Sequence, residues 1–203
     1  MIQESPSAAR ARALQSAVRE KYRAVARRPE ARFPYPVGRR SALRLRYEPA
    51  WIDALPDPVV RRFVGVGNPF AARRPRAGER VLDLGCGAGF DAFVAALLVG
   101  ERGTVVGLDL TREMLDVARR HADAWPLGNV AFRLGKAERL PFEASSFDLV
   151  VSNGVLNLVP DKDAAFQEAF RVLRPGGAFA VADLLVTEEV PEEVLADMDA
   201  WST

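Results

Sequence analysis

The sequence predicts an α/β fold with a doubly wound, mostly parallel sheet and an N-terminal helical extension. Three observations carry this prediction. From residue 80 onward, short apolar runs alternate with helical segments, and the first of these runs ends in a glycine-rich turn. An amphipathic stretch at the start of the chain is separated from the alternating region by prolines. We therefore divide the chain into a helical extension or lid over residues 1–75 and a sheet domain over residues 76–203.

The extension begins with a helix predicted over residues 7–27. Apolar side chains recur there at steps of four and three, at Leu14, Val18, Tyr22 and Val25. Three prolines then exclude regular structure, namely Pro29, Pro34 and Pro36. A short helical piece is expected over residues 48–66, because Pro49 suits a first helical turn.

The sheet domain is predicted to contain five strands, at residues 81–84, 104–108, 130–134, 147–152 and 178–185. Helices are expected at residues 91–99, after Thr111 and at about 161–173. Thr111 is of a residue type that caps helix N-termini, and the helix after it would face inward through Met114, Leu115 and Ala118. Parallel strands need crossover helices, so both faces of the sheet should be covered.

A glycine-rich turn, Gly85-Cys-Gly-Ala-Gly89, lies between the first predicted strand and the helix after it. Glycines let the backbone turn sharply and approach a ligand, and the helix start offers free N–H groups. The dinucleotide-binding fingerprint requires a third glycine at the sixth position, which is Phe90 here. The spacing instead favours a nucleotide-like cofactor without a pyrophosphate, and S-adenosylmethionine is such a cofactor.

Asp109 ends the second predicted strand, twenty residues after Gly89. A carboxylate at this point of a nucleotide-binding fold can accept hydrogen bonds from both ribose hydroxyls. The alternative is that Asp109 caps the following helix, but Thr111 is better placed for that role. We therefore expect Asp109 to bind the ribose.

These segments resemble class I S-adenosylmethionine-dependent methyltransferases, which have a Rossmann-like sheet, and they are closest to the arsenite methyltransferase branch. The resemblance extends over almost the whole chain. It rests on the segments Val18–Tyr22, Gly65–Pro69, Val81–Asp91, Gly107–Leu115, Asn129–Gly135, Ser152–Leu158, Pro160–Lys162, Phe170–Gly177 and Asp199–Trp201. The glycine turn and Arg174-Pro-Gly-Gly177 are common among small-molecule methyltransferases, whereas Gly67-Asn-Pro69 is more particular to this branch.

The resemblance implies a set of cofactor-binding residues. The methionine end of the cofactor would be held by Asp83, Gly85, Cys86, Gly87 and Gly89. Asp109 would bind the ribose, with the adenine against Leu110 and Met114 and its amino group beside Ala137 and Glu138. The sulfonium and the substrate would face Ser152 and Asn153. The implied reaction is direct in-line methyl transfer to a small molecule, with S-adenosylhomocysteine as the product. No general base is predicted, since Asp163, Asp199 and Tyr47 are weakly placed.

Two departures from the family affect its chemistry. The arsenite enzymes bind arsenic through cysteine thiolates, but Val66 and Gly154 occupy two of the typical positions, and the chain stops at Thr203 before a third. Trivalent arsenic needs soft ligands, so we do not expect thiolate-dependent arsenite methylation. Lys136 replaces the usual acid beside the adenine amine, and lysine cannot accept a hydrogen bond. Glu138 or the backbone at Ala137 would have to substitute.

A third departure is the end of the chain. Residues 186–203 are acidic and predicted to form loop and helix, so the antiparallel hairpin that follows the fifth strand in this class is expected to be missing. The fifth strand would then be an uncovered edge, which pairs readily with another chain. We expect a homodimer, or else a fragment of a longer natural chain; the alternative is that residues 186–203 fold back over the edge.

Composition excludes several other classes. The single Cys86 rules out an internal disulfide and a cysteine-cluster metal site, and the only histidine is His121. No apolar run reaches the length of a membrane span, so we expect no membrane partner and a cytoplasmic location.

Charge divides the chain into two halves. Residues 1–80 hold 18 Lys/Arg and 7 Asp/Glu, whereas residues 81–203 hold 10 and 20. We favour a basic segment docked on an acidic domain of its own or a neighbouring chain over a nucleic-acid-binding arm. The rival functions are a catalytically silent cofactor-binding scaffold and a nucleic-acid methyltransferase.

Overall fold

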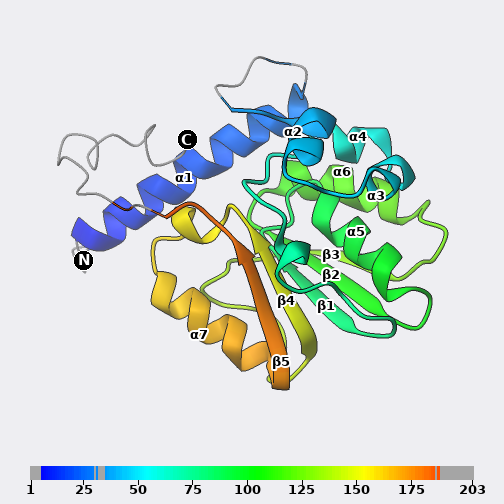
Figure 1. The fold of residues 1–203 in the computed structure, drawn as a ribbon. Helices are drawn as coiled ribbons and strands as arrows, with labels where there is room; N and C mark the ends of the chain where they lie inside the picture. Colours follow the sequence, from blue (N-terminus) through cyan, green and yellow to red (C-terminus); the bar gives the residue numbers. More distant parts are fainter. Residues whose placement is uncertain (1–5, 30, 32–34, 186, 188–203) are drawn as a thin grey trace.

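The sheet is parallel throughout and has the strand order β3-β2-β1-β4-β5. The computed structural model describes residues 6–29, 31, 35–185 and 187. The strands in this part are β1 (Arg80–Leu84), β2 (Thr104–Asp109), β3 (Val130–Leu134), β4 (Phe147–Asn153) and β5 (Leu173–Ala182) (Figure 1). The strand order reverses between β1 and β4, and such a switch point opens a crevice at the carboxyl ends of the strands.

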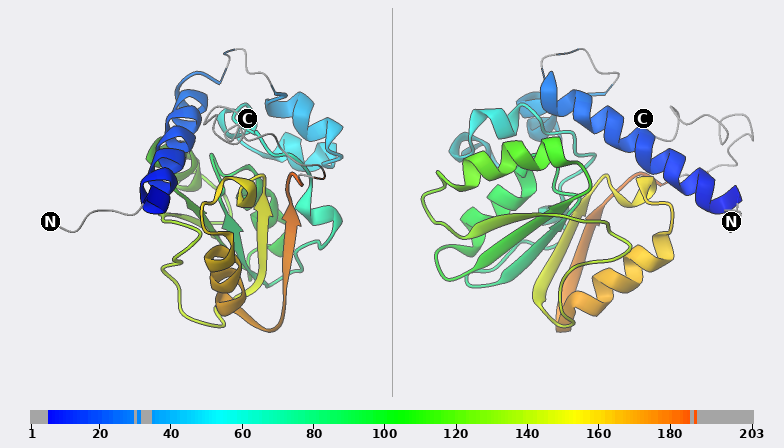
Figure 2. Two further views of the ribbon diagram at one scale, coloured as in Figure 1. Left: turned by 90° about the vertical axis from the view of Figure 1, so that its left-hand side faces the viewer. Right: turned by 180° about the vertical axis from the view of Figure 1, so that it is seen from behind.

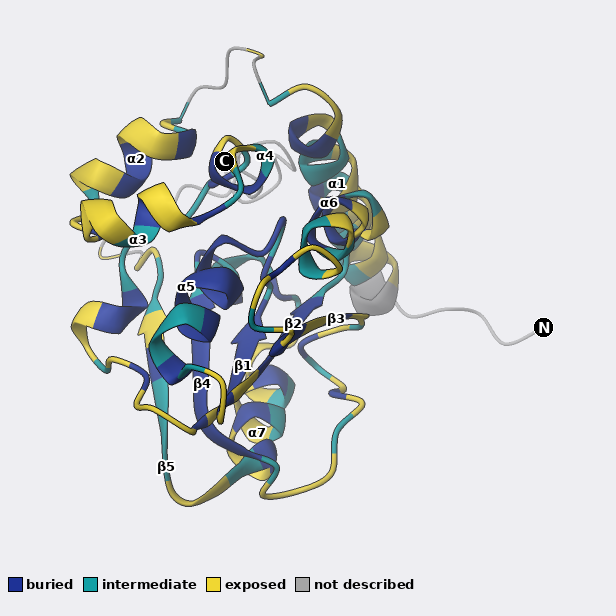
Figure 3. Ribbon diagram, turned by 90° about the vertical axis from the view of Figure 1, so that its right-hand side faces the viewer, coloured by how far each residue is buried: buried dark blue, intermediate teal, exposed yellow. Residues whose placement is uncertain are grey.

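Alternation of side chains along β1 divides the core between the two faces of the sheet. Leu82 and Leu84 pack in one cluster with residues of α7 (Lys162–Val172), and Val81 packs in another with Phe93 of α5 (Phe90–Val99). Both faces of β1 are therefore covered, and Figure 3 shows β1 and β4 as buried whereas β5 is largely half-buried or exposed. Helix α6 (Arg112–Ala122) covers the α5 face, with Met114, Leu115 and Ala118 buried as predicted.

The N-terminal segment packs onto the sheet domain. Helix α1 (Pro6–Arg27) crosses above the carboxyl ends of the strands (Figures 1 and 2). Its residues Val25 and Ala26 pack with Met114 and Val117 of α6. Arg23 Nε also donates to Glu113 Oε1 at 2.6 Å. Of the apolar stripe predicted on α1, Val18 and Val25 are buried, whereas Leu14 and Tyr22 are half-buried.

Some predicted elements need correction. The described residues between α1 and α2 (Gly38–Arg44), which include Pro29 and Pro36, form no helix or strand, as predicted, but α2 itself was not predicted. The helical piece predicted over residues 48–66 is two short helices, α3 (Pro49–Ala54) and α4 (Asp57–Val60). These two helices are separated at Pro56, the N-cap of α4.

The fifth strand was predicted over residues 178–185, but β5 begins earlier and ends at Ala182. The Arg174-Pro-Gly-Gly177 segment falls within β5 but has no register partner on β4, because Phe147 pairs with Leu173 whereas Leu149 pairs with Ala178. β5 ends at Ala182. The carboxylate of the next residue, Asp183, accepts the backbone N–H of Leu156 at 2.7 Å. The predictions for residues 186 and 188–203, including the missing hairpin, lie outside the described residues.

Within the described ranges, the helices are too short or too polar to cross a bilayer.

Candidate active site

A cavity lies at the switch point, beneath α1. It contains about 980 Å³ of empty space, part of it open to solvent. We call it the cofactor cavity. Most of the residues predicted to bind a cofactor line it, namely Gly85, Cys86, Gly87, Asp109, Leu110, Ala137, Glu138 and Asn153. The turn after β1, the end of β2, the loop after β3 and the tip of β4 are thus brought together.

The glycine turn forms one wall of this cavity. Gly85 has a φ of +75°, and a Cβ there would lie 2.3 Å from the Val155 side chain, so only glycine fits. Gly87 has a φ of +53°, and a Cβ there would meet nothing within 4 Å. The backbone at Gly87 is therefore open to close approach by a ligand.

The Asp109 carboxylate joins this turn to the end of β2. It accepts the backbone N–H of Gly87 at 2.8 Å and that of Thr111 at 2.7 Å, on different oxygens. Burial raises its pKa, and the bonds from Thr111 and Gly87 oppose that rise. Since each carboxylate oxygen can accept more than one bond, capacity remains for two hydroxyls. Thr111 does stand at the N-cap of α6, but its side chain makes no capping hydrogen bond.

At the other end of the cavity, Gln15 of α1 joins two residues of the loop after β3. Its Nε2 donates to Glu138 Oε1 at 3.0 Å, and its Oε1 accepts from Lys136 Nζ at 2.8 Å. Sequence reasoning missed Gln15, although it stands three residues before Val18 and seven before Tyr22, on the same helix face. Glu138 and Lys136, both singled out in the sequence, are therefore hydrogen-bonded to α1.

A buried network joins the extension to the tip of β4. Tyr47 donates to Asp91 Oδ1 at 2.5 Å, and Asn153 Nδ2 donates to Asp91 Oδ2 at 2.9 Å. Asn153 Oδ1 also accepts the backbone N–H groups of Val66 and Gly67, at 2.9 and 3.1 Å. Burial raises the pKa of Asp91 to about 6, while bonds from Tyr47 and Asn153 oppose the rise. Tyr47, weakly placed by the sequence alone, thus helps to fix the loop beside the cavity.

Four predicted site residues stand behind the cavity wall. Met114 is fully buried and packs with Val25 and Ala88, and the Ser152 hydroxyl donates to the Leu84 carbonyl at 3.2 Å. Gly89, the last glycine of the turn, and Asp83 complete this set, and neither is among the lining residues.

Asp83 has a buried carboxyl group with a perturbed pKa. Its Oδ2 is buried and has no hydrogen-bond partner. Burial, followed by the Asp91 and Asp109 carboxylates, raises the pKa of Asp83 well above its ordinary value. A cationic or hydrogen-bond-donating ligand nearby would relieve this arrangement.

A second cavity adjoins the first and contains about 850 Å³ of empty space, part of it open to solvent. The two share wall residues, namely Tyr22, Val64, Gly65, Gly154 and Leu158. Val66 and Gly154, the two positions at which the resemblance leads us to expect cysteines in the arsenite branch, meet here, because a Cβ on Gly154 would lie 3.1 Å from Val66 Cγ1. We call this second space the acceptor cavity.

Cys86 is poorly suited to replace those thiols. It is buried in the glycine turn, and its thiol lies 3.6 Å from the Gly87 carbonyl oxygen. Burial, with the Asp83 and Asp109 carboxylates, raises its pKa well above the ordinary value, so it is a thiol rather than a thiolate near neutral pH. The part of the chain that the structure describes also contains no cluster of His, Cys, Asp and Glu able to hold a metal.

Comparison with known proteins agrees with this geometry. A family model described as a methyltransferase domain matches residues 75–203. The chain belongs to this methyltransferase family. The predicted resemblance to class I S-adenosylmethionine-dependent methyltransferases near the arsenite branch is therefore confirmed. The family uses S-adenosylmethionine and releases S-adenosylhomocysteine.

Individual methyltransferase relatives differ in their acceptors. The chain is 48% identical over 139 residues to an arsenite methyltransferase from Halobacterium salinarum, covering 68% of this chain and 35% of that protein. It is 41% identical over 109 residues to a ubiquinone/menaquinone biosynthesis C-methyltransferase from Vibrio vulnificus, covering 53% and 42%. The structure of an arsenic(III) S-adenosylmethionine methyltransferase from Chlamydomonas reinhardtii matches with a TM-score of 0.66 and 46% identity, covering 73% and 53%. This chain therefore spans 35–53% of the length of these relatives.

Proposed function

We propose that the chain binds S-adenosylmethionine in the cofactor cavity and methylates a small molecule held in the acceptor cavity. The observation that carries this proposal is the junction of the two cavities at Gly65 and Gly154, beside the Asn153 network. Bound S-adenosylmethionine would supply an electrophilic methyl group: a lone pair of the acceptor would form the new bond to the methyl carbon, the S–C electron pair would stay on sulfur, and a proton on the acceptor would leave through the side of the acceptor cavity that is open to solvent. The chain's contribution is to align the two ligands and exclude water.

The cavity residues suit the parts of this cofactor. The open backbone at Gly87 fits the methionine end, which carries an ammonium group, and the Asp83 carboxyl group would support this end from behind the cavity wall. Asp109 would accept from the ribose hydroxyls, and the adenine would lie toward Leu110, Ala137 and Glu138. Glu138 would exchange its bond with Gln15 for one with the adenine amine. Ser152 and Met114 would support the wall rather than touch the ligand.

Binding of S-adenosylhomocysteine is the experiment that tests this proposal. Calorimetry should show one site for S-adenosylhomocysteine and none for NAD, because Phe90 crowds the position where a dinucleotide fold needs glycine. Binding of NAD together with no binding of S-adenosylhomocysteine would contradict the proposal.

A catalytically silent cofactor-binding protein is the second candidate. One observation in its favour is that Gln15 already hydrogen-bonds Glu138 and Lys136, at the end of the cavity where the adenine would lie. The other is that positions 66 and 154 are Val and Gly and carry no thiol. Such a protein would bind S-adenosylhomocysteine and methylate none of a broad set of acceptors. Turnover of S-adenosylmethionine with any acceptor would remove this candidate.

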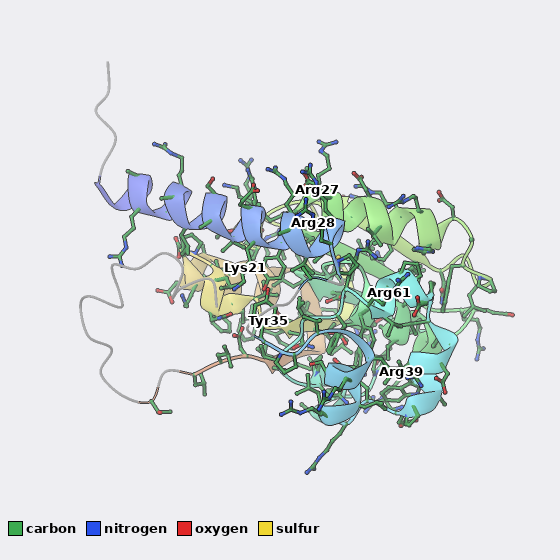
Figure 4. The ribbon with its side chains drawn as sticks, turned by 90° about the horizontal axis from the view of Figure 1, so that it is seen from above. Lys21, Arg27, Arg28, Tyr35, Arg39 and Arg61 are labelled. Atoms are coloured by element: carbon green, nitrogen blue, oxygen red, sulfur yellow. The ribbon has the colours of Figure 1, made fainter. Side chains whose placement is uncertain are left out.

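We do not propose a nucleic-acid substrate, because several arginines of the basic segment are paired within the chain. Arg23 pairs with Glu113, Arg39 with Asp53 at 2.5 Å, and Arg61 with Asp57 at 2.9 Å. Figure 4 shows Arg27 and Arg28 at the end of α1, Arg39 on α2 and Arg61 just after α4, so these arginines come from separate parts of the extension. Of these three pairs, only Arg23–Glu113 joins the basic segment to the acidic domain, and this pair supports the docked-segment interpretation of the charge asymmetry.

We propose that two copies associate through β5, which is an edge of the described sheet. Apolar side chains near it are exposed, with Val181 at 36% and Phe170 of α7 at 67%. Light scattering should give twice the chain mass of 22.2 kDa. Val181→Lys should give a monomer, since edge lysines oppose strand pairing. Leu134→Lys on β3, at the opposite edge, should leave the dimer intact, and a monomer of the unaltered chain would contradict the proposal.

A further inference from the structure

Each carboxylate on the wall of the cofactor cavity has a different place. The acids that line it, among the described residues, are Asp91, Asp109 and Glu138. Asp109 is joined to the glycine turn through Gly87, and Glu138 is held at the other end by Gln15. Since the ribose and the adenine would take those two acids, Asp91 is the lining carboxylate that remains for the sulfur end of the ligand.

Asp91 also lies close to the junction of the two cavities. It stands in the first turn of α5, and its Oδ2 accepts from Asn153 Nδ2 at 2.9 Å. A Cβ on Gly65 would lie 2.3 Å from the same Asn153 nitrogen, and Gly65 is one of the residues that the two cavities share. One amide group therefore separates the Asp91 carboxylate from the junction, where methyl transfer would take place.

The Asp91 carboxyl group is placed to respond to a nearby cation. It is buried, and its oxygens accept from two neutral side chains, Tyr47 and Asn153, while no described lysine or arginine pairs with it. Burial raises the pKa of Asp91 to about 6, so the group is largely ionised near neutral pH. Burial also raises the pKa of Tyr47 well above its ordinary value, so this hydroxyl stays neutral.

Asp83 of β1 is the carboxyl group that faces Asp91 from the sheet. The charge on Asp91 adds to the effect of burial in raising the pKa of Asp83. Asp83 Oδ2 has no hydrogen-bond partner, whereas both oxygens of Asp91 have one, so the negative charge of this pair lies on Asp91. A buried charge in low-dielectric surroundings attracts an opposite charge more strongly than an exposed one does.

Resting on the proposed binding of S-adenosylmethionine, we propose that Asp91 distinguishes this substrate from the product S-adenosylhomocysteine by the charge on sulfur. The sulfur of the substrate is a positive sulfonium, whereas that of the product is a neutral thioether, because the S–C electron pair stays on sulfur when the methyl group leaves. The two ligands carry the same ammonium, carboxylate, ribose and adenine groups, so contacts with those parts do not separate them. Transfer of the methyl group thus ends the attraction to Asp91 and favours release of the product.

The two ligands themselves test this inference on the full chain without a methyl acceptor. Calorimetry at neutral pH and moderate salt measures the affinity for each, and the ratio of the two affinities is the preference. S-adenosylmethionine should bind at least about tenfold more tightly than S-adenosylhomocysteine, as expected for one charge pair in a partly buried site. Equal affinities would overturn the proposal, whereas failure of both ligands to bind would overturn the underlying function.

An isosteric variant assigns the preference to Asp91. Asp91→Asn deletes the charge and keeps the side-chain shape, so it should weaken S-adenosylmethionine binding about tenfold and S-adenosylhomocysteine binding by less than about threefold. Asp116→Asn is the matched control, because Asp116 is exposed on α6 and does not line the cavity. An equal loss for both ligands in Asp91→Asn would overturn the proposal, since Asp91 would then act on a group that both ligands carry.

The pH dependence gives a readout in the unaltered chain. The preference should be complete at neutral pH and be lost as the pH falls below about 6, because protonation removes the charge of Asp91. Titration of Asp109 affects a contact common to both ligands and largely cancels in the ratio. Tyr47 lowers the pKa of Asp91 by its hydrogen bond, so Tyr47→Phe should keep the preference at alkaline pH and lose it at a higher pH than the unaltered chain. A preference that stays constant across this range in the unaltered chain would overturn the proposal.

Discussion

Asp109→Ala is expected to weaken S-adenosylhomocysteine binding by about 1.5–3 kcal/mol, or roughly 10- to 150-fold. The physical reason is the loss of a buried anionic acceptor for two ribose hydroxyls. The same substitution releases the backbone N–H groups of Gly87 and Thr111, so part of the loss would come from loosening of the glycine turn.

Two further variants separate these contributions in calorimetry. Asp109→Asn keeps one oxygen acceptor and the side-chain shape, and it should lose less affinity than the alanine variant. Asp116→Ala is the matched control, since Asp116 is exposed on α6 and pairs with Arg119 only at 4.0 Å. Unchanged affinity in Asp109→Ala would refute the ribose role.

Arsenite is expected not to be methylated by the unaltered chain, and the double variant Val66→Cys/Gly154→Cys is expected to gain arsenic(III) binding. The two side chains would meet, because a Cβ on Gly154 already lies 3.1 Å from Val66. Two thiols on one trivalent arsenic should tighten binding of phenylarsine oxide by at least about 100-fold, or about 2.7 kcal/mol. Fluorescence titration under a monothiol reductant measures this gain.

The control for this variant is Val66→Cys/Gly154→Ala. Gly154 has a φ of +68°, so any side chain there is strained by about 1–2 kcal/mol, and the alanine variant carries that strain without the second thiol. Arsenic speciation tests the unaltered chain in parallel. Robust methylarsenic production that survives Cys86→Ser would show that the thiolate argument is wrong.

Local patterns were sufficient to predict the first four strands of the sheet. The strands β1 to β4 were placed within about one residue, because short apolar runs between glycines and polar turns have few alternative structures. Gly85, Gly87 and Asp109 line one cavity, and their selection rested on the glycine spacing after the first strand and on the acid that ends the second.

Features that depend on distant contacts were not predictable in this way. Gln15 reaches Glu138 across 123 positions of the chain, and Tyr47 reaches Asn153 across 106. Neither pairing leaves a periodic pattern in the sequence from which it could be predicted. Met114 was placed correctly on the inner face of α6, but its predicted contact with the adenine was not found. It packs under α1 rather than lining the cavity.

A crystal structure with S-adenosylhomocysteine tests the central claim most directly. We expect the ribose at Asp109, the adenine beside Ala137 and Glu138 with Gln15 displaced from its bond to Glu138, and the sulfur facing the junction at Gly65 and Gly154. A ligand whose sulfur points away from the acceptor cavity, or that binds outside the cofactor cavity, would contradict the account.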